Sequence, residues 1–507
     1  MLAKNKESNR QSNENDRGRN EANCDCENCE CENCERENNV KISRESWFYL
    51  SVLAGCIVFA GCFLNATFKW MSRAQMTLMI AAPVADFTPV KRASLNYNGL
   101  LFPGSQEDEN EVHLKSFDYV WTKIKESYWE KDFGGVDWDQ ARKELRPKVA
   151  KAKNIKEVRE ILNQLISKMG KSHYAIIPHT AYRATVLTRR GSADAGLTFR
   201  YSNDKVLVSG VRSKSDAEKK GIVPGWEITK VGENNVADFL KKAKSYEGVV
   251  RLDSLIAMRF GNLTTGHANR SIECEFVLPD GKKETISIRL SDPPGRFVKF
   301  GNLPPMRISM EKKLLGSNVG YFRFNGFFDP VRLMPEFRKA VKEFQQADGM
   351  VIDIRGNGGG MVGLTMGMAS PLTANPAPLG VMKMKNQELK LALFKTPKPY
   401  QKKIAVLVDE ASASASEIYA GGLQDLKIAK VFGRRTAGLS LPSTVERLPN
   451  GDGFQYAIAN YTSASGKILE GNGVVPDVAV ELTPANLTDE FDPTLKRAVE
   501  WIQSESN

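Results

Sequence analysis

An apolar run that stops abruptly at small residues is the feature that most constrains how this chain can fold. Residues 404–408 are aliphatic, and alanine and serine alternate from 411 to 416 before a helix-like pattern begins. This is typical of a buried strand that turns directly into a helix. Ser414 then lies at the turn, where unpaired N–H groups give the helix N-terminus a positive potential. Such a position suits a nucleophilic serine, but Ser414 and Glu417 also fit a capping box, which only begins a helix.

Strand-like and helix-like patterns alternate around this turn, which predicts an α/β domain with a largely buried sheet over residues 293–484. The predicted strands are 319–324, 350–354, 404–408 and 430–432, and the predicted helices are 330–346, 416–424 and, after the domain, 485–507. Sites in such sheets form at the carboxyl ends of strands, where Ser414 and the glycine-rich segment 355–360 both fall. No Lys-Ser/Thr pair follows these glycines, so they could present a backbone N–H to an oxyanion rather than bind a nucleotide.

Residues 1–45 are rich in Asn, Glu and Arg and almost free of apolar residues. Such a segment cannot bury enough surface to fold, so we expect a disordered tail. Two Cys-x-x-Cys units lie in it, between Cys26 and Cys34. Four thiolates can bind zinc, but the single residue between the units is too little for a zinc-ribbon loop. We therefore predict no metal site and interpret the repeat as low-complexity sequence, with zinc binding as the alternative.

Residues 46–68 are the one segment of membrane-spanning length in the sequence. They carry no charge from Trp47 to Phe63, and Lys/Arg residues are slightly more frequent before the segment than after it. The positive-inside rule then places the tail in the cytoplasm and the rest of the chain on the periplasmic or extracellular side. A lipoprotein-like cleavage box ends at Cys56, but apolar sequence continues beyond it, so we expect an uncleaved single-pass signal anchor. A linker, residues 69–113, is predicted to follow.

Residues 114–186 show the spacing of amphipathic helices. Apolar residues from Phe117 to Tyr128 recur at helical intervals and predict a helix with one buried face. Further helices are predicted at 141–152 and 155–169, followed by an extended segment at 171–178. That extended segment contains Ser172 and His173.

The next region, residues 187–292, is predicted to be a small β-rich domain. Its predicted strands are 197–201, 205–209, 272–278 and 284–290. Four residues match the loop of a PDZ domain whose backbone amides bind a peptide's terminal carboxylate: Gly196, Leu197, Thr198 and Phe199. One departure from the PDZ pattern is Trp226, where an aspartate is usual. The resemblance implies peptide binding by strand addition, and a β-domain that binds no peptide is the alternative.

The motifs of residues 114–480 together resemble those of the S41 group of tail-specific, carboxyl-terminal processing serine peptidases, and they run in the same order. The matching segments are 117–128 with 136–138, the Ser172-His173 element, the PDZ-like insert, 353–360, 412–417 with 423–425, and 470–477. The resemblance implies a ClpP/crotonase-like α/β core that follows an N-terminal helical region. It also implies a serine endopeptidase that hydrolyses polypeptides and needs no metal or organic cofactor.

By this resemblance Ser414 is the nucleophile. The oxyanion hole is formed by the backbone amides of Ala415 and of Gly358 or Gly359. The best-known bacterial members use a lysine base that follows a glycine, but here Leu439 occupies that position. The chain therefore resembles the tricorn-like branch, whose base is a histidine. The residues that match that branch are Ser172, His173 and Glu470.

The chemistry agrees with a histidine base. A serine hydroxyl is a poor nucleophile until a base removes its proton, and a histidine that titrates near neutrality suits that task. We expect activity to rise with pH through about 6–7, the range of an ordinary imidazole. The other three histidines lack such a motif, because His113 falls in the linker, His267 in a polar loop and His179 beyond the Ser-His element.

Two other classes of function are compatible with the same motifs. A scaffold that binds peptides without cleaving them would explain the missing lysine, and retinoid- or lipid-binding modules occur on a related fold. An intact set of Ser414, His173 and Glu470 argues against both. The net charge of +11 is scattered rather than gathered into stripes, so we expect no nucleic-acid partner. The expected partners are polypeptide substrates and a membrane; the sequence predicts no oligomeric state.

Overall fold

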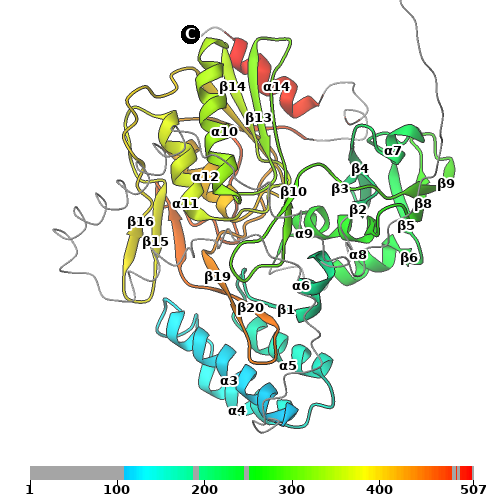
Figure 1. Cartoon of the computed structure of the whole chain (residues 1–507), viewed down its shortest axis with the longest axis vertical. Coiled ribbons are helices and arrows are strands. Elements are labelled where there is room, and N and C mark those ends of the chain that lie inside the picture. Colours follow the sequence, from blue (N-terminus) through cyan, green and yellow to red (C-terminus); the bar gives the residue numbers. More distant parts are fainter. Residues whose placement is uncertain (1–107, 187–192, 245–249, 482–486, 488–491, 505–507) are drawn as a thin grey trace, which may run out of the picture. The chain divides into compact units, whose positions relative to one another are not determined.

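A six-stranded sheet forms the centre of residues 310–479 (Figure 1). The strands, in spatial order, are β12 (Met310–Leu314), β13 (Val319–Phe324), β14 (Gly349–Asp353), β17 (Lys403–Val408), β18 (Lys430–Gly433) and β22 (Val478–Ala479). β12 is antiparallel to β13, and all the other neighbours are parallel. The predicted α/β domain is confirmed, and its four predicted strands are present to within one residue at either end.

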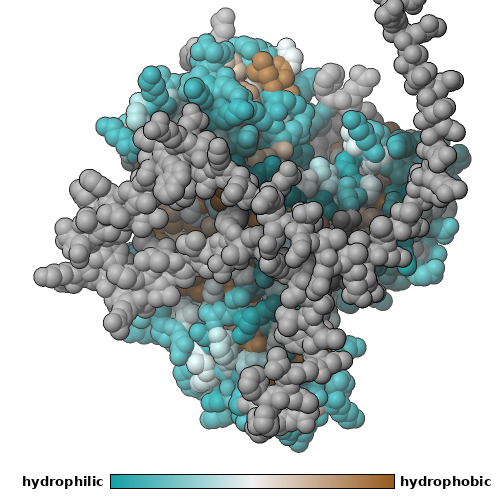
Figure 2. All heavy atoms as spheres, viewed as in Figure 1, coloured by the Kyte–Doolittle hydropathy of each residue, from teal (hydrophilic) through white to brown (hydrophobic). Residues whose placement is uncertain are grey.

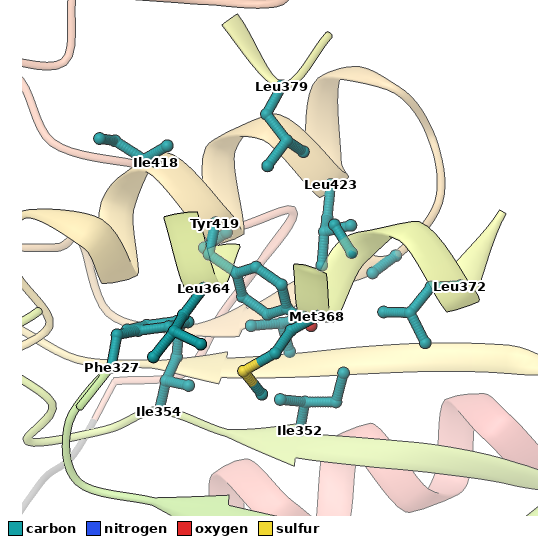
Figure 3. Close-up of a cluster of buried hydrophobic side chains, with 14 of the residues drawn as sticks. Phe327, Ile352, Ile354, Leu364, Met368, Leu372, Leu379, Ile418, Tyr419 and Leu423 are labelled. Atoms are coloured by element: carbon teal, nitrogen blue, oxygen red, sulfur yellow. The ribbon is translucent and has the colours of Figure 1, made fainter. Parts of the chain in front are cut away.

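Helices cover both faces of this sheet because successive residues of each strand point to opposite sides and both sides are apolar. One face is covered by α10 (Pro330–Glu343), α11 (Val362–Ala369) and α12 (Ala415–Asp425). The other face packs against α14 (Pro493–Gln503). In Figure 3, Tyr419 of α12 and Met368 of α11 point toward Ile352 of β14. The sheet is therefore buried between two layers of helices.

The structure is a computed structural model that describes residues 108–186, 193–244, 250–481, 487 and 492–504. All of these residues belong to one compact unit, residues 96–507. The predicted tail, the predicted anchor at 46–68 and nearly all of the predicted linker lie outside the described residues. Within the described residues, no helix combines the length and the apolar character needed to cross a membrane. The anchor therefore stays a prediction.

Three helices precede the sheet in the chain: α3 (Glu109–Ser127), α4 (Trp138–Val149) and α5 (Ile155–Ser167). Their apolar faces meet in one buried cluster, as the helical spacing predicts. α3 begins at Glu109 rather than at 114, because Asp108 caps it and acidic residues favour its first turn. His113 therefore lies buried inside a helix, and the prediction that it falls in a linker is wrong.

The segment after α5 forms β1 (Ala175–Ile177) and α6 (His179–Val186). β1 pairs with β20 (Gly453–Ala457), which in turn pairs with β19 (Ser443–Arg447). This small sheet fixes the Ser172-His173 element, which directly precedes β1, beside a much later part of the chain.

The β-rich region has an antiparallel sheet of its own. Its strands, in spatial order, are β3 (Leu197–Ser202), β4 (Lys205–Val211), β5 (Glu227–Val231), β8 (Ser271–Val277) and β9 (Lys283–Arg289), with β6 (Asn234–Asn235) paired to β5. Its helices are α7 (Asp216–Lys219), α8 (Val236–Lys244) and α9 (Leu252–Arg259). The four predicted strands are present, and β3 lies at an edge of the sheet. The resemblance to a PDZ domain stays a prediction.

Shorter elements complete the described chain. They are β2 (Ala193–Asp194), β7 (Thr265–Gly266), β10 (Arg296–Val298), β11 (Met306–Ile308), β15 (Gly380–Lys383), β16 (Glu388–Lys390) and β21 (Asn460–Ser463), with short 3-10 helices at 260–264, 344–346 and 370–372. The described surface visible in Figure 2 is mainly hydrophilic, and hydrophobic residues occupy only small areas of it.

Candidate active site

Three serines surround the start of α12, and their surroundings differ. Ser412 and Ser416 are fully buried, and their hydroxyls donate to the backbone carbonyls of Ile354 at 2.9 Å and Asn357 at 2.8 Å. Ser414, the middle serine, is partly exposed. The outer two serines therefore hold the turn in place, and the middle one is accessible.

The backbone of Ser414 is strained. Its φ of 57° and ψ of −120° are rarely adopted by a residue with a side chain. Its N–H donates to the carbonyl of Leu439 at 2.8 Å and to Glu417 Oε2 at 3.1 Å. α12 begins at the next residue, Ala415, so the strand turns into the helix at Ser414, as the sequence predicts.

Glu417 fixes this turn to the segment 436–439. Its buried carboxylate accepts four hydrogen bonds from Ser414 N, Gly438 N, Leu439 N and Thr436 Oγ1. Burial raises the pKa of Glu417 to about 7, although these hydrogen bonds lower it. Glu417 thus forms the predicted capping box with Ser414 and, in addition, binds the segment 436–439 to the start of α12.

The glycine-rich loop after β14 lies directly against the Ser414 turn. The carbonyl of Asn357 accepts from Ala413 N at 3.1 Å, and its side chain donates to the Phe324 carbonyl at 3.1 Å. A β-carbon at Gly359 would lie only 2.6 Å from the Ser414 β-carbon. The two loops meet because β14 and β17 are adjacent parallel strands, as their positions at the carboxyl ends predict.

Two backbone N–H groups beside Ser414 are available to an oxyanion. Gly359 N already donates to Asn357 Oδ1 at 2.9 Å. In the described part of the chain, neither Gly358 N nor Ala415 N has a hydrogen-bond partner. Of the two glycines that the sequence could not separate, Gly358 is therefore the one with a free donor.

The Ser172-His173 element is joined to Glu470. Glu470 accepts from Ser172 N at 2.8 Å, from Ser172 Oγ at 2.9 Å and from Ser440 N at 2.9 Å. Ser172 Oγ also lies 2.7 Å from His173 Nδ1. Because the single hydroxyl proton goes to the carboxylate, Ser172 Oγ accepts from Nδ1–H of the neutral ring. His173 Nε2 is then the basic nitrogen.

Burial lowers the pKa of His173 to about 4, below the range of 6–7 expected from an ordinary imidazole. The ring is neutral at pH 7 and lines a pocket together with Gly358, Ala413 and Leu439. Within the described residues, His173 and Ser414 are not hydrogen-bonded to each other. The backbone of His173, with φ of 63°, is also in the left-handed region.

Neither of the two lysines that follow α12 lines the pocket of His173. Leu439 lines the pocket beside His173. Lys430 pairs with Ala405 near the start of β17, at the opposite end of the sheet from Ser414. Lys427 precedes that end of β18 and is exposed.

The predicted peptide-binding loop lies between β2 and the edge strand β3. Gly196 has a φ of 76°, and its N–H donates to Asp194 Oδ1 at 2.8 Å. Leu197, Thr198 and Phe199 begin β3, and α9 packs beside this strand.

The sequence did not predict that Arg200 of β3 binds two acidic residues in the loop that leads from β17 to Ser414. Arg200 Nη1 donates to Glu410 Oε2 at 2.8 Å, and its Nη2 donates to Asp409 Oδ2 at 3.2 Å. Glu410 is fully buried, and Arg434 Nε lies 3.6 Å from the same Glu410 oxygen. No sequence signal could have revealed this pairing, because a strand arginine and a loop glutamate are ordinary surface residues.

Two family models match the chain. The model of peptidase family S41 matches residues 318–480, and the model of the tricorn protease C1 domain matches residues 111–167. Residues 318–480 are a peptidase family S41 domain. This S41 domain contains Ser414, the glycine-rich loop and Glu470, whereas Ser172 and His173 lie outside both matched segments.

Relatives of this chain include serine proteases. A probable CtpA-like serine protease of Staphylococcus epidermidis is 25% identical over 289 residues, which cover 56% of this chain and 52% of that protein. This chain therefore spans about half the length of that relative. The chloroplastic carboxyl-terminal-processing peptidase 3 of Arabidopsis thaliana is 22% identical over 451 residues, which cover 85% of this chain and 81% of the relative.

Solved structures are similar to this chain in fold. The photosystem II D1 C-terminal processing protease is similar with a TM-score of 0.52 at 21% identity, over 78% of this chain and 98% of that chain. Mature CPAF is similar with a TM-score of 0.50 at 16% identity, over 78% of this chain and 96% of that chain. At these identities the likeness concerns the fold alone.

Proposed function

We propose that this chain is a serine endopeptidase in which Ser414 is the nucleophile and His173 the general base. The observation that carries the proposal is the hydrogen-bonded series from Glu470 through Ser172 to His173. In this series His173 is a neutral imidazole whose basic nitrogen is Nε2, and its side chain lines the same pocket as Gly358. A histidine oriented by a third group is the arrangement that activates a serine.

In the proposed reaction, Ser414 Oγ attacks the carbonyl carbon of the scissile peptide bond while His173 Nε2 takes its proton. The N–H groups of Gly358 and Ala415 donate to the oxyanion that forms. The C–N bond then breaks, and His173 returns the proton to the leaving amine. Water repeats the attack on the acyl-enzyme and restores Ser414.

Substrate binding completes this site in the proposal. Ser414 and His173 are not yet hydrogen-bonded to each other in the described residues. Catalytic hydrogen bonds are often long or misaligned in unliganded enzymes and shorten when the substrate binds. The proposal requires Ser414 Oγ and His173 Nε2 to come within hydrogen-bond distance of each other when the substrate binds.

The β-rich region is proposed to recruit polypeptide substrates as a PDZ-like domain. Its edge strand β3 offers unpaired backbone groups to an added strand, and the loop at Gly196 precedes that strand. The names of the Arabidopsis and staphylococcal relatives, which are carboxyl-terminal-processing or CtpA-like, agree with recognition of chain ends.

Membrane anchoring through residues 46–68 is also proposed, with the S41 domain on the non-cytoplasmic side. Its support is the uncharged run from Trp47 to Phe63. Protease added to cells with a permeabilised outer layer should digest the S41 domain and spare the tail. Digestion of the tail alone would contradict this orientation.

A covalent serine probe tests the proposed activity. A fluorophosphonate should label the parent chain and fail to label Ser414→Ala, and the parent alone should hydrolyse an unfolded protein. Ser213→Ala, which changes an exposed serine of the β-rich region, is the matched control and should behave like the parent. Equal hydrolysis by parent and Ser414→Ala would rule out the nucleophile, and a parent that binds peptide without labelling or hydrolysis would favour a scaffold.

A further inference from the structure

The pocket beside His173 is bordered by charge of one sign. It has a volume of about 860 Å³, and His173, Gly358 and Leu439 all line it. Its apolar wall consists chiefly of Ile166, Phe239, Ala243, Val250, Leu255 and Met258. Its described lining contains no aspartate and no glutamate.

Three cationic side chains line this pocket from three different elements. Lys171 directly precedes Ser172, Lys242 lies on α8, and Arg259 is the last residue of α9. Among the described residues, neither Lys171 nor Arg259 forms an ion pair, and both are exposed. At least two positive charges at this pocket therefore lack a counter-charge within the described residues.

In a neighbouring pocket, by contrast, the cations that line the wall are paired with acidic side chains. That pocket, of about 680 Å³, is also lined by three cations, from α8, the start of α9 and the loop after β18. Each of the three is paired with an acid: Lys244 with Asp204, Arg251 with Asp253, and Arg434 with Glu410. In that pocket every lining cation has an acidic partner, whereas Lys171 and Arg259 have none among the described residues.

We propose that the pocket beside His173 selects polypeptides that carry a carboxylate close to the scissile bond. This proposal rests on the proposed function, because it names the substrate class of the same site. Beside an apolar wall, ionic attraction is stronger than in open water, so a carboxylate is bound and a basic side chain is repelled. The carboxylate is either an Asp or Glu side chain or the terminal carboxylate of the substrate.

Matched fluorogenic peptides distinguish these two sources. All share one apolar sequence around the scissile bond and differ only nearby: Gln with a C-terminal amide, Glu with the amide, Lys with the amide, and Gln with a free C-terminus. For the parent chain, kcat/KM should be about threefold or more higher for the Glu amide or for the free acid than for the Gln amide. The Lys amide should be the poorest substrate, and added salt should reduce the differences.

Variants connect the preference to the named cations. Lys171→Gln and Arg259→Gln should each reduce the carboxylate-to-Gln ratio by about twofold to fivefold. Arg259→Glu should move the preference toward the Lys peptide. Arg338→Gln removes an exposed arginine of α10 that does not line the pocket, and should leave the ratio unchanged.

A binding measurement separates failure of this inference from failure of the proposed function. Fluorescence anisotropy with Ser414→Ala reports the affinity for the same peptides without hydrolysis. Tighter binding of a carboxylate peptide, lost in Lys171→Gln and Arg259→Gln, supports the inference even if no peptide is ever cut. Equal affinities and equal kcat/KM for the Gln, Glu and free-acid peptides overturn it even if Ser414 proves to be the nucleophile.

Discussion

Gly359 faces Ser414 so closely that a β-carbon at position 359 would lie 2.6 Å from the Ser414 β-carbon. The same β-carbon would lie 2.9 Å from Ala415 N, one of the two donors available to an oxyanion. The φ of Gly359, 102°, is in addition unfavourable for any residue with a side chain. The glycine loop and the Ser414 turn are thus fitted to each other without space for even a methyl group.

Gly359→Ala should therefore lower both activity and stability. Overpacking and backbone strain at a buried loop cost about 1–3 kcal/mol, so the midpoint of urea unfolding should fall clearly. Gly358→Ala is the matched stability control, because nothing lies within 4 Å of the added β-carbon. Equal unfolding midpoints for the two variants would mean that the loop moves freely away from Ser414.

Ser172→Ala should lower kcat with little effect on KM, because Ser172 orients His173 rather than binding substrate. His173→Ala should lose about 10⁴-fold or more, as removal of the base in a serine triad does. Glu470→Gln should lose less than His173→Ala, since an amide oxygen at the position of Oε2 can still accept from both Ser172 Oγ and Ser440 N.

Conservative and distant variants make this test specific. Ser172→Thr keeps the hydroxyl and should recover part of the lost kcat. Lys430→Ala, at the opposite end of the sheet, should have near-parental kcat. If Lys430→Ala is folded and inactive while Ser172→Ala is fully active, a lysine and not His173 is the base.

The pH dependence should reflect the lowered pKa of His173. The basic, neutral imidazole predominates above its pKa, so kcat/KM should rise with pH through about 4 and be level by pH 6. NMR titration of the ring protons in Ser414→Ala gives the pKa directly, and His173→Ala identifies the signal among four histidines. A midpoint at 6–7 would show that the ring is solvated as in an unfolded chain.

The lowered pKa of His173 also makes the free energy of unfolding depend on pH. The folded pKa lies below the unfolded value of about 6.5, so His173 favours the folded state fully above pH 6.5. This contribution is lost as pH falls from 6.5 through about 4. His173→Ala should therefore flatten the dependence of unfolding free energy on pH within that window, and an unchanged slope would contradict the burial of the ring.

Glu417→Gln should destabilise the Ser414 turn. The amide NH₂ group would face N–H and O–H donors that now point at a carboxylate, which costs about 1–3 kcal/mol for each donor left without an acceptor. Thermal unfolding measures the loss. Glu388→Gln on the exposed strand β16 is the control and should change stability by less than about 0.5 kcal/mol.

The elements that surround Ser414 could be predicted because local sequence determines them. β13 has its predicted bounds because it is apolar on both faces, and the small residues from 411 to 416 placed the strand-to-helix turn. The sequence also placed Gly358 and Gly359 beside Ser414, since adjacent parallel strands end at one edge. The sequence could not tell which of the two glycines has an N–H free for an oxyanion. The structure shows that Gly359 N already donates to Asn357 Oδ1, which leaves Gly358 N.

Other properties depend on contacts that no local pattern encodes. The pKa of His173 moved from the expected 6–7 to about 4 because burial is a property of the folded chain. The pairing of Arg200 with Glu410 joins residues 210 positions apart, and neither has a distinctive neighbourhood in the sequence. α3 was placed too late because its capped first turn is polar and carries no apolar period.

The hydrogen bonds between Ser172 and Glu470 join residues that are 298 positions apart. A ribosome makes His173 and Ser414 long before Glu470 leaves the exit tunnel. A growing chain thus has the proposed nucleophile and the proposed base before it has the carboxylate that holds Ser172 beside His173. In the proposed mechanism the chain then gains competence for peptide hydrolysis only after Glu470 has been made, while β22 and α14 of the same domain are still to follow.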